Sequence, residues 1–192
     1  MRRIGAAAAA LVLAGTVLGA GATTAGAAPA TTSRATTCPT GWGSGAKGGV
    51  AAGAVPLKDI RTGRHDCFDR MVFDVPGGGG DIGYYVRYVD RLYQDGSGRY
   101  IPVAGGAVLE IRVAAPSYEP DSGAPAYPGR VARPLPGVDI GGYRTFRDTR
   151  FAGSFEGETQ VGLGVRARLP FRVIQLPDRL VVDVAHSWTS AR

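Results

Sequence analysis

A seven-residue phrase that occurs twice constrains this chain more than any other feature of its sequence. The first copy reads DRMVFDV over residues 69–75, and the second reads DRLVVDV over residues 178–184. Five of the seven positions are identical, and the other two exchange one apolar residue for another. Each copy is rich in β-branched and large apolar residues and contains neither glycine nor proline, which is typical of a β-strand. The repeat therefore predicts two related halves, each contributing one such strand.

Successive side chains of a strand point to opposite faces, so each copy has one wholly apolar face and one mixed face. This pattern is typical of a sheet that covers a core on one side and meets solvent on the other. We expect Phe73 and Val182 to be buried at equivalent places in two packed halves. The apolar faces comprise Met71, Phe73 and Val75 in the first copy, and Leu180, Val182 and Val184 in the second; the mixed faces comprise Arg70, Val72 and Asp74, and Arg179, Val181 and Asp183.

The remainder of the chain also favours short strands, and it shows no sustained 3.6-residue periodicity after the N-terminal segment. Residues 114–142 are rich in proline and glycine and predict a long surface loop between the two halves. Together these features predict an all-β fold, a β-sandwich of two related halves. Further strands are expected over residues 84–93, 100–103, 108–113, 143–151, 159–169 and 171–176.

The N-terminus has the organisation of a secretory signal. Arg2 and Arg3 precede an apolar stretch over residues 4–17, and Ala25-Gly26-Ala27 matches an A-x-A cleavage site. Glycines interrupt the apolar stretch, which is therefore weak for a permanent membrane span. We expect residues 1–27 to be a signal peptide, 28–56 a flexible Ala/Thr/Gly-rich linker and 57–188 the folded domain of a secreted protein. Two arginines do not by themselves decide between Sec and Tat export.

The chain has two cysteines, and in an exported protein they predict one disulfide, Cys38 to Cys67. The alternative is a pair of free thiols. Trp42 is expected to pack on the domain near this disulfide rather than stack on a ligand.

No recognisable catalytic or cofactor site emerges from the sequence. Two histidines, His65 and His186, and two cysteines do not have the spacing of a zinc site, and no serine lies in a G-x-S-x-G motif. Glu156 and Glu158 lie close together in an expected turn. Glycoside cleavage needs two carboxylates on opposite sides of a cleft, so this pair does not predict a glycosidase site. The sequence therefore predicts a non-enzymatic protein without a metal or cofactor.

The most suggestive surface carries Tyr85, Arg87, Arg91 and Tyr93 on one face of the strand expected over residues 84–93. Arginine binds carboxylates or phosphates, and tyrosine stacks on sugar rings, so we take these four as candidate binding residues. The alternative is that they only cover a solvated sheet face. The formal net charge is +6, and removal of residues 1–27 with two arginines leaves +4, which suits weak attraction to anionic polymers. Export takes nucleic acid out of consideration as a partner.

Five segments of the chain form a recognisable set: residues 63–74, 83–89, 155–157, 170–173 and 178–184. Together they resemble a known family, the AMIN-like domain of secreted and lipid-anchored proteins in high-GC Gram-positive bacteria. That group is similar to the AMIN domain of cell-wall amidases and pilus secretins, which are β-sandwiches that place their partners on peptidoglycan without catalysis. The resemblance implies a secreted, non-enzymatic module that associates with the cell envelope through peptidoglycan or anionic wall polymers. A secreted hydrolase or inhibitor with an unrecognised site, and a protein-interaction domain, remain the alternatives. The resemblance spans about residues 57–188.

Overall fold

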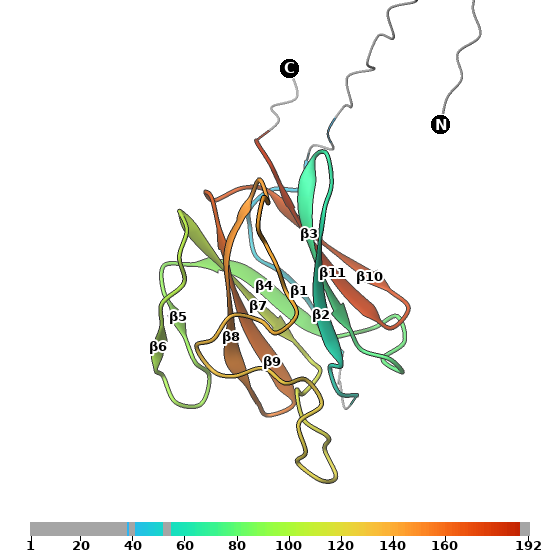
Figure 1. Cartoon of the computed structure of the whole chain (residues 1–192). Coiled ribbons are helices and arrows are strands. Elements are labelled where there is room, and N and C mark those ends of the chain that lie inside the picture. Colours follow the sequence, from blue (N-terminus) through green and yellow to red (C-terminus); the bar gives the residue numbers. More distant parts are fainter. Residues whose placement is uncertain (1–37, 39–40, 52–54, 189–192) are drawn as a thin grey trace, which may run out of the picture. The chain divides into compact units, whose positions relative to one another are not determined.

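Two antiparallel β-sheets face each other in the computed structural model, which describes residues 38, 41–51 and 55–188 (Figure 1). The described residues contain no helix, so the predicted all-β sandwich is confirmed. The expected signal peptide, residues 1–27, lies outside the described residues. The strands are β1 (Lys47–Gly49), β2 (Asp59–Arg64), β3 (Phe68–Asp74), β4 (Tyr84–Val89), β5 (Leu92–Tyr93), β6 (Tyr100–Ile101), β7 (Ala107–Val113), β8 (Phe146–Phe155), β9 (Glu158–Val165), β10 (Phe171–Leu176) and β11 (Arg179–Ala185).

The larger sheet has the strand order β1-β4-β7-β9-β8, and the smaller has β10-β11-β3-β2. Strands β5 and β6 form a separate two-stranded hairpin. Apolar side chains from the facing sides of both sheets fill the space between them and exclude water, which is the main stabilising contribution to a fold of this kind. The largest fully buried side chains of this core include Phe73, Phe146, Phe171, Met71, Leu109, Ile111, Leu163 and Leu180.

The two copies of the repeated phrase lie side by side as the central strands of the smaller sheet. Strands β3 and β11 are antiparallel, and Val72 at the centre of one copy pairs with Val181 at the centre of the other. Phe73 and Val182 are fully buried, as predicted. The expectation that the copies occupy two separate packed halves is wrong: the related units are the hairpins β2–β3 and β10–β11 within one sheet. Antiparallel neighbours satisfy each other's backbone hydrogen bonds, which makes this pairing of like strands favourable.

The loop over residues 114–142 does not join the two related units. It connects β7 to β8, which lie on either side of β9 in the larger sheet. It is also more than a surface loop, because Tyr127 and Leu135 are buried in the main core. The chain needs a long connection here because β9 occupies the place between the two strands.

Part of the segment expected to be a flexible linker, residues 28–56, is an ordered part of the sandwich. Strand β1 pairs with the edge strand β4, Gly48 lying opposite Tyr85. A three-residue strand of Lys-Gly-Gly has no apolar alternation, so sequence periodicity does not reveal it. Trp42 packs edge-on against Phe68 with 5.6 Å between ring centroids, close to the disulfide as expected. Cys38 and Cys67 form that disulfide, with their Cα atoms 5.3 Å apart.

Within the part of the chain that the structure describes, no helix is long and apolar enough to cross a bilayer.

Candidate binding groove

The β5–β6 hairpin folds over the outer face of the larger sheet and forms one wall of a groove. The single strand expected over residues 84–93 is broken at Asp90, so β4 stays in the larger sheet and β5 leaves it. The hairpin approaches closely because β9 has glycines at the contact: a Cβ at Gly162 would overlap Leu92, and one at Gly164 would overlap the carbonyl of Ala104. Leu92 and Ile101 are buried beneath the hairpin in a small second core.

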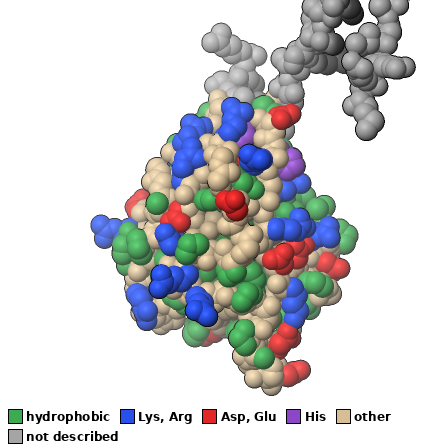
Figure 2. Space-filling model, viewed as in Figure 1, with side chains coloured by type: hydrophobic (Ala, Val, Ile, Leu, Met, Phe, Trp, Pro, Cys, Tyr) green, Lys and Arg blue, Asp and Glu red, His purple; other side chains and the backbone are tan. Residues whose placement is uncertain are grey.

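The groove consists of three adjoining hollows that share Asp95 and Gly96 in the turn between β5 and β6. Their volumes are about 330 Å³ at the β4 end, about 340 Å³ in the middle and about 250 Å³ at the β8 end. The three adjoin one another and are open to solvent, so they form one open groove rather than an enclosed cavity. Figure 2 shows basic and acidic side chains interspersed over one face of the molecule, with basic side chains at the top and on the left, where Figure 1 places β5 and β6.

Three of the four predicted binding residues line one end of this groove: Arg87 on β4, Arg91 at the strand break and Tyr93 on β5. Tyr85 lies beside them, with its ring centroid 5.4 Å from the guanidinium carbon of Arg87. The sequence predicted that the four lie on one face of a single strand, and this is wrong because they are divided between β4, the strand break and β5. The fold nevertheless brings them together. That they bind a ligand stays a prediction.

Arg91 and Tyr100 form a second arginine–tyrosine pair next to the basic end of the groove. The guanidinium carbon of Arg91 lies 6.0 Å from the ring centroid of Tyr100, and the rings of Tyr93 and Tyr100 are 5.9 Å apart. Tyr93 is 47% exposed and Tyr100 52% exposed, so both rings present much of their area to solvent. Exposed tyrosines held by arginines make a surface on which sugar rings can stack.

A buried carboxylate, Glu110 of β7, fixes the floor of the groove. It is 3% exposed and accepts hydrogen bonds from Arg87 Nε at 2.8 Å, Gln160 Nε2 at 2.7 Å and Arg112 Nε at 3.4 Å. Burial by itself would raise the pKa of Glu110, but the hydrogen bonds from Arg87 and Gln160 and the charge of Arg112 outweigh it, and the pKa is lowered. Glu110 therefore stays ionised and holds two guanidinium groups in place at the groove.

Arg112 links this floor to the turn that all three hollows share. Its Nη2 donates to Asp95 Oδ1 at 2.6 Å. Burial raises the pKa of Asp95, although the charge of Arg112 opposes the shift. The far end of the groove is lined by Phe155, which is 49% exposed, and by Glu158; Glu156 lines the middle hollow.

Glu110, Arg112, Asp95 and Phe155 also line the groove and were not predicted as site residues from the sequence. Tyr100, which packs beside Tyr93, was not predicted either. Alternation placed Glu110 and Arg112 together on the polar face of the strand over residues 108–113. Alternation does not give the register between neighbouring strands. The pairing of β4 with β7 places Arg87 opposite Glu110 and Tyr85 opposite Arg112.

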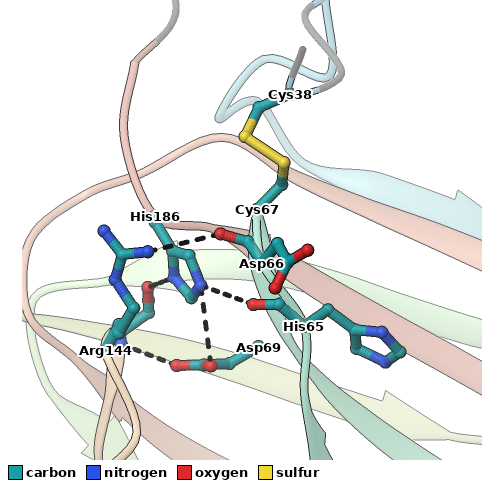
Figure 3. Close-up of a disulfide and its surroundings, with 8 residues drawn as sticks. Cys38, His65, Asp66, Cys67, Asp69, Arg144 and His186 are labelled. Atoms are coloured by element: carbon teal, nitrogen blue, oxygen red, sulfur yellow. Dashed lines mark hydrogen bonds and ion pairs between the residues drawn. A yellow bond between two sulfur atoms is a disulfide. The ribbon is translucent and has the colours of Figure 1, made fainter. Parts of the chain in front are cut away.

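A second polar cluster lies next to the disulfide, where His186 and Asp69 lie close together (Figure 3). Thr145 joins them through its hydroxyl group. His186 Nδ1 is 2.9 Å from Thr145 Oγ1, and His186 Nε2 lies 3.9 Å from Asp69 Oδ1. His186 Nε2 is hydrogen-bonded to the backbone oxygen of His65 at 2.9 Å and not to Asp69, and Thr145 is fully buried, so the cluster is not arranged as a nucleophilic triad. His65, the other histidine of the sequence analysis, is exposed and stacks on Phe68 at 4.4 Å.

Among the residues that the structure describes, no three His, Cys, Asp or Glu side chains are grouped closely enough to hold a metal ion.

Comparison with known proteins assigns the chain to a family. The AMIN-like domain family matches residues 55–186, which is more than half of the chain and covers every strand from β2 to β11. No curated protein and no solved structure matches the chain. The protein therefore belongs to the AMIN-like domain family.

Proposed function

We propose that the protein is a secreted, non-enzymatic module that associates with the cell envelope by binding a wall polymer in the groove beneath the β5–β6 hairpin. The observation that carries this proposal is the basic, aromatic end of the groove, where Arg87, Arg91, Tyr85 and Tyr93 come together. Guanidinium groups bind carboxylates or phosphates, and tyrosine rings stack on sugars. Peptidoglycan and anionic wall polymers offer these groups outside a bacterial cell.

Binding without catalysis fits the chemistry of the groove. Glu110 is held ionised by three donors, and its lowered pKa makes it a poor general acid. Asp95 is ion-paired to Arg112. Glu110 is therefore not poised to transfer a proton to a ligand, and both carboxylates hold arginines in place at the groove.

Membership of the AMIN-like family supports a place outside the cytoplasm, and the signal sequence over residues 1–27 supports export with cleavage after Ala27. The intact mass of the protein recovered from culture medium or from the wall fraction tests this directly. A mass that retains residues 1–27 would contradict it.

Co-sedimentation of the purified mature protein with isolated cell walls tests the binding. We expect the protein to pellet with walls at low salt and to release no soluble wall fragments. Binding should weaken as salt rises, because exposed charges are screened over about 8 Å at physiological ionic strength.

The informative variant is Arg91→Ala, because the described residues offer Arg91 no carboxylate partner and its loss leaves Glu110 satisfied. Arg130→Ala removes the same charge from an exposed position in the 114–142 loop and serves as the matched control. We expect Arg91→Ala to reduce the bound fraction and Arg130→Ala to leave it nearly unchanged. Absence of binding at low salt, or equal effects of the two variants, would contradict the proposal; steady release of wall fragments would favour a hydrolase.

A further inference from the structure

The groove is not uniformly basic, and its charge changes sign along its length. We propose that its ligand is a polymer that carries amino groups as well as acidic groups, as the stem peptides of peptidoglycan do, and not a uniformly anionic chain. This inference rests on the proposed function and names the chemical class of the ligand that the same groove takes.

The end near β4 favours an acidic group next to a ring. Arg91 has no carboxylate partner among the described residues, and its guanidinium lies against the ring of Tyr100. Arg87 donates its Nε to Glu110, and its side chain is 44% exposed. A carboxylate or phosphate that enters here meets two guanidinium groups together with the exposed faces of Tyr93 and Tyr100.

The charge changes sign in the middle of the groove, where Arg112 lies on one side and Glu156 and Glu158 on the other. Arg112 lies between Glu110 and Asp95 and pairs with both. The backbone at Gly96 belongs to all three hollows, and the ring of Phe155 lies 3.2 Å from where a Cβ of Gly96 would be. A glycine at this point keeps the groove open between its two ends.

The part of the groove from the middle hollow to the end near β8 and β9 favours an amino group, because Glu156 lines the middle hollow and Glu158 lines both hollows. Glu156 and Glu158 are exposed, and neither has an ion-pair partner in the part of the chain that the structure describes. They lie beside Phe155, an exposed ring that gives a ligand an apolar surface. A repeating phosphate polymer laid along the groove would bring a negative charge against these carboxylates, whereas an amino group would pair with them.

The acidic side chains are part of a groove and not an isolated surface cluster. The three adjoining hollows have arginines at one end and carboxylates without ion-pair partners among the described residues at the other, with exposed aromatic rings at both. The pattern therefore matches a ligand with separated opposite charges and with a sugar ring or an apolar part beside each charge.

The test compares three probes: peptidoglycan sacculi stripped of anionic polymers, the same sacculi with their free amines acetylated, and a linear polyphosphate. The variants are Glu156→Gln with Glu158→Gln, and Arg91→Gln. The double variant Asp81→Asn with Asp121→Asn removes two exposed acidic charges elsewhere and is the matched control.

We expect the wild-type protein to bind untreated sacculi about fivefold more tightly than acetylated sacculi for each amine–carboxylate contact that is lost. The Glu156/Glu158 variant should bind both preparations equally and should bind polyphosphate better than the wild type does. Arg91→Gln should weaken binding to both sacculus preparations, and the Asp81/Asp121 control should keep the wild-type preference.

A Glu156/Glu158 variant that keeps the full preference for untreated sacculi would overturn the inference while leaving the proposed function intact. Tighter wild-type binding to polyphosphate than to sacculi would do the same. Failure of the wild-type protein to bind any of the three probes would refute the proposed function and the inference with it.

Discussion

Arg70 in the first copy of the repeated phrase binds Asp183 in the second with two hydrogen bonds, Nε to Oδ1 at 2.7 Å and Nη2 to Oδ2 at 2.9 Å. Arg179 in the second copy binds Asp74 in the first, Nε to Oδ1 at 2.9 Å. The second position of each copy thus meets the sixth position of the other. The two ion pairs are related by the local two-fold axis that passes between Val72 and Val181.

The aspartate that opens each copy has a matching role. Asp69 Oδ2 accepts hydrogen bonds from the backbone amides of Thr145 and Phe146 at 2.6 and 3.2 Å. Asp178 Oδ1 accepts them from the amides of Gly77 and Gly79, both at 3.0 Å. Each copy therefore uses its first residue to cap a neighbouring loop and its second and sixth residues to bind the other copy. The repetition of these polar residues follows from the pairing of the two strands and not from ligand binding.

The two aspartates of the symmetric ion pairs predict unequal stability effects. The Asp183 side chain is 0% exposed and binds Arg70 and Arg172, whereas the Asp74 side chain is 18% exposed and binds Arg61 and Arg179. Removal of the buried partner leaves guanidinium groups without their carboxylate, so Asp183→Ala should lower the free energy of unfolding by about 3–5 kcal/mol. Asp74→Ala should cost about 1 kcal/mol, because its partners reach solvent.

Urea denaturation of both variants measures this difference. Equal losses, or a larger loss for Asp74→Ala, would show that burial does not set the strength of the two pairs.

Glu110 predicts a pH dependence of stability. Its pKa is lowered in the folded protein, so its ionised form stabilises the fold. That contribution is fully present above the ordinary glutamate pKa of about 4.3 and is lost as the pH falls through the lower, folded-state value. Glu110→Gln should therefore be less stable than the wild-type protein at neutral pH, and the difference should shrink toward pH 3. Urea midpoints at several pH values test this, and a difference that is constant across the range would contradict it.

The disulfide predicts a contribution that acts through the unfolded chain. Cys38 and Cys67 are 29 residues apart in sequence. Closing a loop of this size restricts the unfolded chain and stabilises the fold by about 3–4 kcal/mol in the chain-entropy model. Replacement of both cysteines by serine should lower the urea midpoint accordingly, and reduction of the wild-type protein should give the same midpoint. Peptide mapping without reductant checks the bond itself, and two free thiols in the exported protein would contradict it.

Gly164 predicts how closely the β5–β6 hairpin must lie on the larger sheet. A Cβ at this position would overlap the carbonyl of Ala104, which is backbone and not a movable side chain. Gly164→Ala should therefore displace the segment after the hairpin, and we expect a loss of about 1–3 kcal/mol, as for other overpacked sites. Gly80→Ala is the matched control, since a Cβ there meets nothing within 4 Å.

Thermal or urea unfolding compares the two glycine variants, and wall co-sedimentation shows whether displacing the hairpin also weakens binding. A Gly164→Ala protein as stable as the Gly80→Ala protein would mean that the hairpin moves freely on the sheet.

The amino-acid sequence was enough to predict the class of the fold, most of the strands and many of the core residues. Alternation of apolar and polar residues depends only on the two-residue period of a strand, so it placed Met71, Phe73, Leu180 and Val182 on buried faces without knowledge of their partners. The pairing of Cys38 with Cys67 also followed from the sequence, because the chain has no other cysteine.

Which strands are neighbours, and in what register, is known only from the folded protein. The pairing of β3 with β11 places the two repeats side by side in one sheet, and the pairing of β4 with β7 places Glu110 opposite Arg87. Tyr93 belongs to the separate β5–β6 hairpin, and Arg91 lies at the strand break just before it. The groove arises from contacts between residues far apart in the chain, such as Gln160 with Glu110 and Leu92 with Gly162. Such contacts depend on how whole sheets pack, and the period of a single strand carries no information about them.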